Sequence, residues 1–136
     1  MFLSLAQFGD WGLLILRIAV GAIFLAHGTQ KLAMWKMQSS DQMPSRMLAI
    51  MRILSIAEPL GGVAMLSGFA VPIAAVGLGI VMAGAIFFKT RVWHKRFSEE
   101  GGWEFDALIL AAVTTLFLLG SGRFGVDAFL SGYQIW

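Results

Sequence analysis

Residues 71–88 read VPIAAVGLGIVMAGAIFF, a stretch without a single charged side chain. A helix needs about 20 mostly apolar residues to cross the hydrocarbon core of a bilayer, and this stretch is close to that length. It therefore predicts a membrane span. Ala75, Gly79 and Ala83 fall four residues apart within it, a spacing that allows another helix to pack closely on one face.

The composition of the whole chain favours the same class. Of its 136 residues, 58% are hydrophobic and 13% are charged, against about 25% charged residues in soluble domains, and the mean hydropathy is +0.78. The chain has no cysteine, which excludes a disulfide scaffold, a thiolate-held cluster and thiol–disulfide chemistry. The net charge of +2 is small, so we expect no nucleic-acid partner.

Three further apolar stretches lie before and after the stretch at residues 71–88. They predict additional spans at residues 11–33, 46–68 and 103–120, with the span at residues 71–88 lying third in order. We therefore expect one all-α domain over residues 1–136, a membrane-embedded four-helix bundle. Short apolar segments before the first span and after the fourth predict interfacial pieces at both termini.

Basic residues gather in the loops after the first and third predicted spans. These loops carry Lys36, Arg46, Lys89, Arg91, Lys95 and Arg96, whereas the opposite side has only Arg123. Cytoplasmic loops of membrane proteins are enriched in Lys and Arg. We therefore expect a multi-pass protein of the inner (plasma) membrane with both basic loops in the cytoplasm and both termini outside it.

Two ionisable residues lie well inside predicted spans, where such residues are rare and often functional. Arg17 is in the first span and Glu58 in the second, and their depths from the span ends predict an Arg17–Glu58 ion pair. This pair has two interpretations. It is either a structural contact that fixes the helix register, or a site in which Glu58 carries protons and Arg17 stabilises its charged form.

A second polar cluster is expected near the basic loops. His27, Gln30 and Lys31 close the first span, and Glu104 and Asp106 open the fourth on the same side. The acidic pair is also what a helix N-terminus favours. His27 either bonds a neighbouring carbonyl group or titrates near neutral pH, which suits proton-coupled chemistry on a quinone or a similar head group.

Other recognisable patterns carry less weight. His27 and His94 fall on the same side of the membrane and could together ligate a haem, but His94 lies in a charged loop, so no haem is expected. The Glu-x-x-His pattern of di-iron bundles is absent, so no metal is expected. Residues 120–125 match G-x-G-x-x-G, but this pattern binds dinucleotides only between a strand and a helix. Here it ends a predicted span, which favours helix termination by glycine.

Four motifs occur in an order that resembles a known membrane family. Residues 16–32, LRIAVGAIFLAHGTQKL, are similar to the first-helix signature of DoxX-type proteins, and residues 57–62, AEPLGG, to their second-helix motif. Residues 101–104, GGWE, resemble the start of their fourth helix. Residues 120–127, GSGRFGVD, resemble their closing motif, in which a serine is frequent at the place of Gly125.

This resemblance implies a compact four-helix bundle and a link to redox chemistry. The family is named for a subunit of an archaeal thiosulfate:quinone oxidoreductase, and bacterial members are linked to redox complexes with soluble partners and to tolerance of quinones and oxidative stress. The polar positions that match the family are Arg17, His27, Lys31, Glu58, Glu104, Arg123 and Asp127.

The residues and the resemblance together lead to a functional hypothesis. We expect the subunit of a quinone-linked redox system that binds a quinone between the first, second and fourth helices. His27 and Glu58 are the catalytic candidates. The ligand-binding candidates are Arg17, Gln30, Lys31, Glu104 and Asp106, and the structural candidates are Gly61, Gly62, Arg123 and Asp127.

Two alternatives remain open at this point, a non-catalytic subunit that anchors a partner protein and a small-molecule transporter. The expected partners are membrane lipid, a soluble or membrane redox protein, and a second copy of the chain. Quinone is the one cofactor expected. The residues leave open whether the chain is catalytic alone, because they supply no electron carrier.

Overall fold

The computed structural model describes residues 8–132, and within this range the chain is helical apart from its loops. Its elements are α1 Gly9–Lys31, the 3₁₀ turn η3 Leu32–Trp35, α2 Ser45–Ser67, α3 Val71–Phe87, the π-helical turn η4 Phe88–Val92, α4 Glu104–Leu119 and α5 Val126–Leu130. The described residues contain no β-strand, only one isolated bridge between Ser40 and Met43. The predicted all-α class is confirmed.

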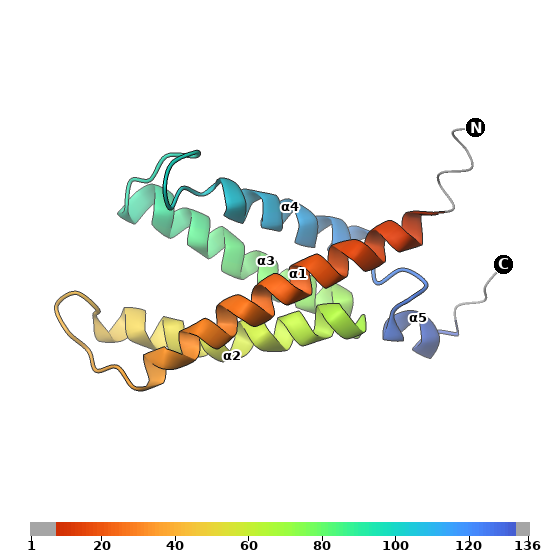
Figure 1. Cartoon of the computed structure of the whole chain (residues 1–136), viewed down its shortest axis with the longest axis horizontal. Helices are drawn as coiled ribbons and strands as arrows, with labels where there is room; N and C mark the ends of the chain where they lie inside the picture. The colour runs from red at the N-terminus through yellow and green to blue at the C-terminus, as the bar shows by residue number, and fades with distance from the viewer. Residues whose placement is uncertain (1–7, 133–136) are drawn as a thin grey trace.

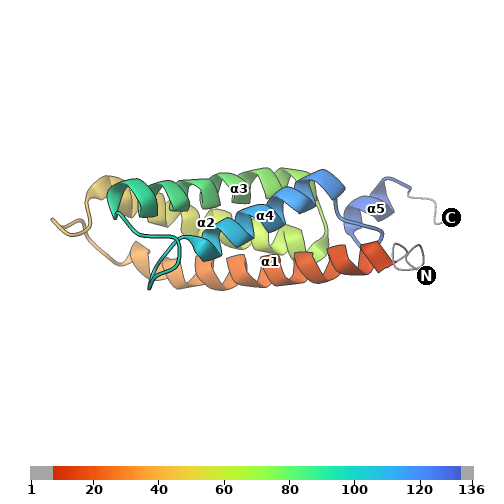
Figure 2. The same cartoon turned by 90° about the horizontal axis from the view of Figure 1, so that it is seen from above.

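The four long helices form one bundle, in which α1 runs diagonally across the others (Figure 1). α1 packs most extensively on α2, and α3 packs on α4. Seen from above, all four lie along the long axis of the molecule (Figure 2). The first turn of α1 and the short α5 lie at one end, and the loops at residues 36–44 and 93–103 lie at the other.

The surface of the bundle is apolar along the helices, as a lipid environment requires. Large aliphatic side chains point outward from every long helix, among them Ile15, Ile53, Ile73 and Leu118. Three helical stretches are long and apolar enough to cross a membrane, Gly9–Trp35, Ser45–Ser67 and Val71–Val92. α4 has 16 residues and is about 24 Å long at 1.5 Å per residue; it completes the membrane-embedded bundle.

Glycines set the register between α1 and α2. A Cβ atom added at Gly21 would lie 2.8 Å from the carbonyl oxygen of Gly62, and one added at Gly28 would lie 2.1 Å from Cδ of Pro59. Because no side chain fits at these two points, the helix backbones approach closely there. This register places the last turn of α1 opposite the middle of α2.

The turn between α2 and α3 is closed by a residue far along the chain. Gly68 ends α2 in the left-handed conformation at φ 71°, and Ala70 precedes α3 at φ 51°. The Asp127 carboxylate accepts hydrogen bonds from the N–H groups of Ala70 and Val71 at 2.6 and 2.9 Å. The N–H group of Asp127 donates to the carbonyl oxygen of Gly68 at 2.9 Å.

The predicted span limits lie within two residues of the observed helix ends. Gly120 ends α4, as expected for the glycine-rich motif, with φ 74°. The short helix α5 occupies the predicted interfacial segment after the fourth span. The interfacial segment predicted at the N-terminus falls on residues 1–7, which lie outside the described part of the chain.

Candidate functional site

A cavity of about 440 Å³ lies between the four long helices, toward the end of the bundle that carries the basic loops. Its walls are mostly apolar, with several methionine and phenylalanine side chains. Its polar lining residues are His27 and Lys31 of α1, Glu58 of α2, Lys89 of η4 and Asp106 of α4.

The cavity has a wall that the sequence interpretation did not include. α3 contributes Ile80, Val81, Met82, Gly84 and Ala85, in addition to the first, second and fourth helices between which the site was predicted. The sequence prediction ranked helices by their polar residues and therefore did not name this fourth wall. An apolar helix supplies the wall that a ligand with an apolar body needs.

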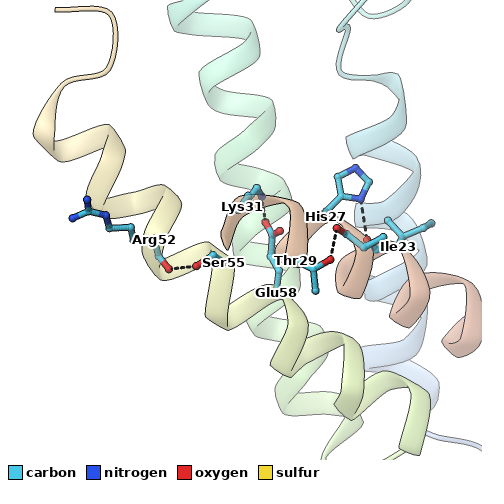
Figure 3. A network of polar contacts seen from close by, with 8 residues as sticks. Ile23, His27, Thr29, Lys31, Arg52, Ser55 and Glu58 are labelled. Atoms are coloured by element: carbon cyan, nitrogen blue, oxygen red, sulfur yellow. Dashed lines mark hydrogen bonds and ion pairs between the residues drawn. The ribbon is translucent and has the colours of Figure 1, made fainter. Parts of the chain in front are cut away.

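Glu58 and Lys31 form the central polar pair of the cavity. Nζ of Lys31 donates to Oε1 of Glu58, bridging the last turn of α1 and the middle of α2 (Figure 3). The Glu58 side chain is 1% exposed and that of Lys31 is 25% exposed. Oε2 of Glu58 is buried and has no hydrogen-bond partner among the described residues, so one acceptor of this cavity-lining residue is left without a donor.

His27 lies one turn before Lys31 on α1. Its Nδ1 is 2.9 Å from the carbonyl oxygen of Ile23, and Figure 3 marks this contact with a dashed line. A neutral imidazole that donates from Nδ1 has its proton there, so Nε2 is left as an acceptor. The ring is stacked at 6.2 Å, between centroids, on Phe105, which also lines the cavity.

A second ion pair lines the cavity between η4 and α4. Nζ of Lys89 donates to Oδ2 of Asp106 at 2.6 Å and to the carbonyl oxygen of Gly102 at 3.2 Å. Lys89 lies in the π-helical turn Phe88–Val92 that extends α3, and such turns are often found at functional sites. The sequence interpretation missed Lys89 as a site residue, although a lysine directly after an uncharged span was a usable signal.

Hydrogen bonds connect the end of the turn after α1, at residues 34–37, to α2. Nε1 of Trp35 donates to Oγ of Ser55 at 2.8 Å, and that hydroxyl donates to the carbonyl oxygen of Arg52 at 2.6 Å. The Arg52 guanidinium donates to the carbonyl oxygens of Met34 and Met37 at 3.2 and 2.8 Å. These contacts hold the end of α1, and hence Lys31, in a fixed position against Glu58.

The predicted Arg17–Glu58 ion pair is wrong. Arg17 is fully buried near the other end of the bundle, where its Nη1 donates to the carbonyl oxygen of Met65 at 3.2 Å. Met65 lies two helical turns beyond Glu58, a distance of about 10 Å. The prediction compared depths measured from the span ends, whereas the glycine contacts set a register in which Lys31 meets Glu58.

Gln30, Glu104 and the structural candidates lie outside the cavity lining, whereas Asp106 lies within it. Gln30 and Glu104 are exposed, and Asp106 bonds Lys89 rather than the cluster on α1. The structural candidates lie at packing contacts: Gly62 against Gly21, Gly61 against Leu78, Asp127 at the start of α3, and Arg123, whose N–H group donates to Asp10 at 3.0 Å. The binding and catalytic roles assigned from sequence stay predictions.

A family model agrees with the resemblance seen in the motifs. The model for DoxX matches residues 12–91, more than half of the chain. The chain belongs to the DoxX family. In this DoxX protein the match contains the first two motifs and most of the cavity walls, while the motifs at residues 101–104 and 120–127 lie beyond it. No curated protein and no solved structure matches the chain.

Proposed function

We propose that this DoxX protein is the membrane subunit of a quinone-linked redox system and binds a quinone or its reduced form in the cavity. The observation that carries the proposal is the unpartnered Oε2 of Glu58, buried beside Lys31 in the wall of a mostly apolar cavity. A buried acceptor without a partner destabilises the folded protein unless a donor completes its hydrogen bonding.

The size and lining of the cavity suit such a ligand. A volume of about 440 Å³ falls within the range of ligand pockets, which are mostly apolar with a few polar groups that fix orientation. Phe24 offers a flat apolar contact for a quinone ring, and Met51 and Met82 offer adaptable ones. Lys31 offers a donor to a ring oxygen.

The ligand is expected to enter from the lipid. In Figure 1, α2 and α3 spread apart from their turn toward the end with the basic loops. Two cavity-lining side chains on these helices are exposed, Ile50 of α2 at 39% and Ile80 of α3 at 68%. An opening between them would face the bilayer, where quinones dissolve.

A bound quinone would supply two-electron, two-proton chemistry. The chain's own residues would bind and orient its ring, and Glu58, Lys31 and His27 are the groups that can hold a proton beside it. The electrons are proposed to come from a partner protein, because the chain has no cysteine for a thiolate-held cluster. We also propose that the basic loops face the cytoplasm, in line with their charge.

A test fills the cavity and compares it with a matched position on the same helix. Gly84 lines the cavity, and a Cβ atom added there meets nothing within 4 Å. Gly77 lies two turns earlier on α3, is equally open, and is outside the cavity lining. We expect Gly84→Phe to weaken the binding of a short-chain quinone to purified protein by about tenfold or more, a loss of at least ~1.4 kcal/mol, and Gly77→Phe to leave it unchanged.

Equal quinone affinity in the two variants and the unmodified protein would contradict the cavity as the binding site. Size-exclusion chromatography of each variant shows whether it remains folded. This control separates a filled cavity from a disrupted bundle.

A further inference from the structure

The hydrogen-bonding state of Glu58 limits which chemical groups could complete its contacts. Its side chain is 1% exposed, Oε1 accepts from Lys31, and Oε2 has no partner. A charged carboxylate only accepts hydrogen bonds. A group that completes the hydrogen bonding of Oε2 must therefore be a hydrogen-bond donor.

Lys31 provides the complementary half of this recognition. An ammonium group has three protons and no acceptor, and Glu58 Oε1 takes one of them. The pair thus presents a free acceptor and further donors side by side. A hydroxyl group both donates and accepts, so a single hydroxyl oxygen can accept from Lys31 while its proton goes to Oε2 of Glu58.

A carbonyl group makes only half of these contacts. A quinone oxygen accepts from Lys31 but leaves Oε2 unpaired, and it brings a second partially negative oxygen toward a carboxylate. Leaving a buried polar group unpaired is the usual basis of strong discrimination between otherwise similar ligands. The difference between the two forms lies in one proton at this position.

The second ion pair does not offer the same selection. Lys89 bonds both Asp106 and the carbonyl oxygen of Gly102. Among the described residues, Glu58 is the acid with a buried oxygen that lacks a partner.

We propose that the cavity selects the hydroxyl-bearing, reduced form of its ligand over the carbonyl form, through Oε2 of Glu58. This inference rests on the proposed function and names which form of the quinone couple the site prefers. The shared chemistry is a phenolic hydroxyl on an apolar body, which a quinol or a redox-inactive alkylphenol can supply.

The selection has a consequence for the bound couple. A site that binds the reduced form about tenfold more tightly raises the potential of a two-electron couple by about 30 mV. Bound ligand would then be easier to reduce than the same ligand free in the membrane.

The test measures the affinity of four probes for the purified protein in nanodiscs without oxygen. The probes are a short-chain quinone, its quinol, the dimethyl ether of that quinol, and an alkylphenol of similar size. We expect the quinol to bind at least about tenfold more tightly than the quinone or the ether. Alkylphenol binding as tight as the quinol supports hydroxyl recognition and assigns it to phenols in general.

Two variants separate the role of Glu58 from a general effect. Glu58→Gln offers an amide that also donates, so the preference for quinol over quinone should fall to near unity. Glu99→Gln changes an exposed acid that is bonded to Lys95 outside the cavity, so the preference should persist. The ratios in the unmodified protein test the proposal even if Glu58→Gln does not fold.

The outcomes distinguish this inference from the proposed function. If quinone, quinol and ether bind with equal affinity, selection by Glu58 is overturned and the quinone site stands. If no probe binds to the unmodified protein, both proposals fall.

Discussion

Gly28→Ala tests whether the glycine contacts set the register that brings Lys31 to Glu58. The added Cβ atom would lie 2.1 Å from Cδ of Pro59 and must move away by about 1.3 Å to reach the 3.4 Å of ordinary contact. Pro59 is a rigid ring inside α2, so the shift must come from the helices themselves. Overpacking of this kind costs about 1–3 kcal/mol.

A matched substitution on the same helix isolates this cost. At Gly12 of α1 an added Cβ atom meets nothing within 4 Å. Both changes gain the helix propensity of alanine over glycine, about 1 kcal/mol in a helix interior, so this gain cancels in the comparison. Gly28→Ala should therefore be less stable than Gly12→Ala by about 1–3 kcal/mol.

Reversible unfolding in SDS, followed by circular dichroism, measures the free energy of unfolding of both variants. Equal values would refute the reasoning, because a contact that accepts a methyl group without cost cannot fix the helix register. A loss of stability in Gly12→Ala of the same size as in Gly28→Ala would refute it as well.

Two further substitutions test the polar contacts at opposite ends of the bundle. Lys31→Met should lower the free energy of unfolding by about 3 kcal/mol, because it leaves Glu58 buried without its partner. This value lies near the lower end for a broken buried pair because the Lys31 side chain is 25% exposed. In a double-mutant cycle, adding Glu58→Gln should restore part of that loss. Asp127→Ala should lower the free energy of unfolding by about 1–2 kcal/mol, because the N–H groups of Ala70 and Val71 lose the carboxylate that caps them. Asp127→Asn should lower it by less. Equal thermal stability of both variants and the unmodified protein would contradict the cap.

The helices of this protein could be predicted from its sequence because apolar runs and loop residues mark them directly. The stretch at residues 71–88 is uncharged, and the glycines at 68 and 120 end helices where the sequence indicates. Glu58 is a candidate from sequence because ionisable residues inside spans are rare and often functional. Lys31, His27 and Asp106 are candidates because they lie at span ends on the same side of the membrane.

The pairing of these residues could not be predicted, for a physical reason. Depth along a span depends on where each helix begins, whereas contact depends on how two helices slide past each other. The close approach of the helices at Gly21 and Gly28 sets their relative register. In this register Glu58 pairs with Lys31 and not with Arg17. Lys89 was missed because its contact with Asp106 depends on a π-helical turn that follows α3.

The contact of Asp127 with the α2–α3 turn has a consequence for how the protein is made. The two backbone N–H groups at the start of α3 leave the ribosome more than fifty residues before the carboxylate that caps them. During that interval α2 and α3 can insert as a hairpin, but the turn between them lacks its partner. The contacts that close this turn can therefore form only after α4 and the start of α5 have been synthesised, so this step of assembly depends on α5.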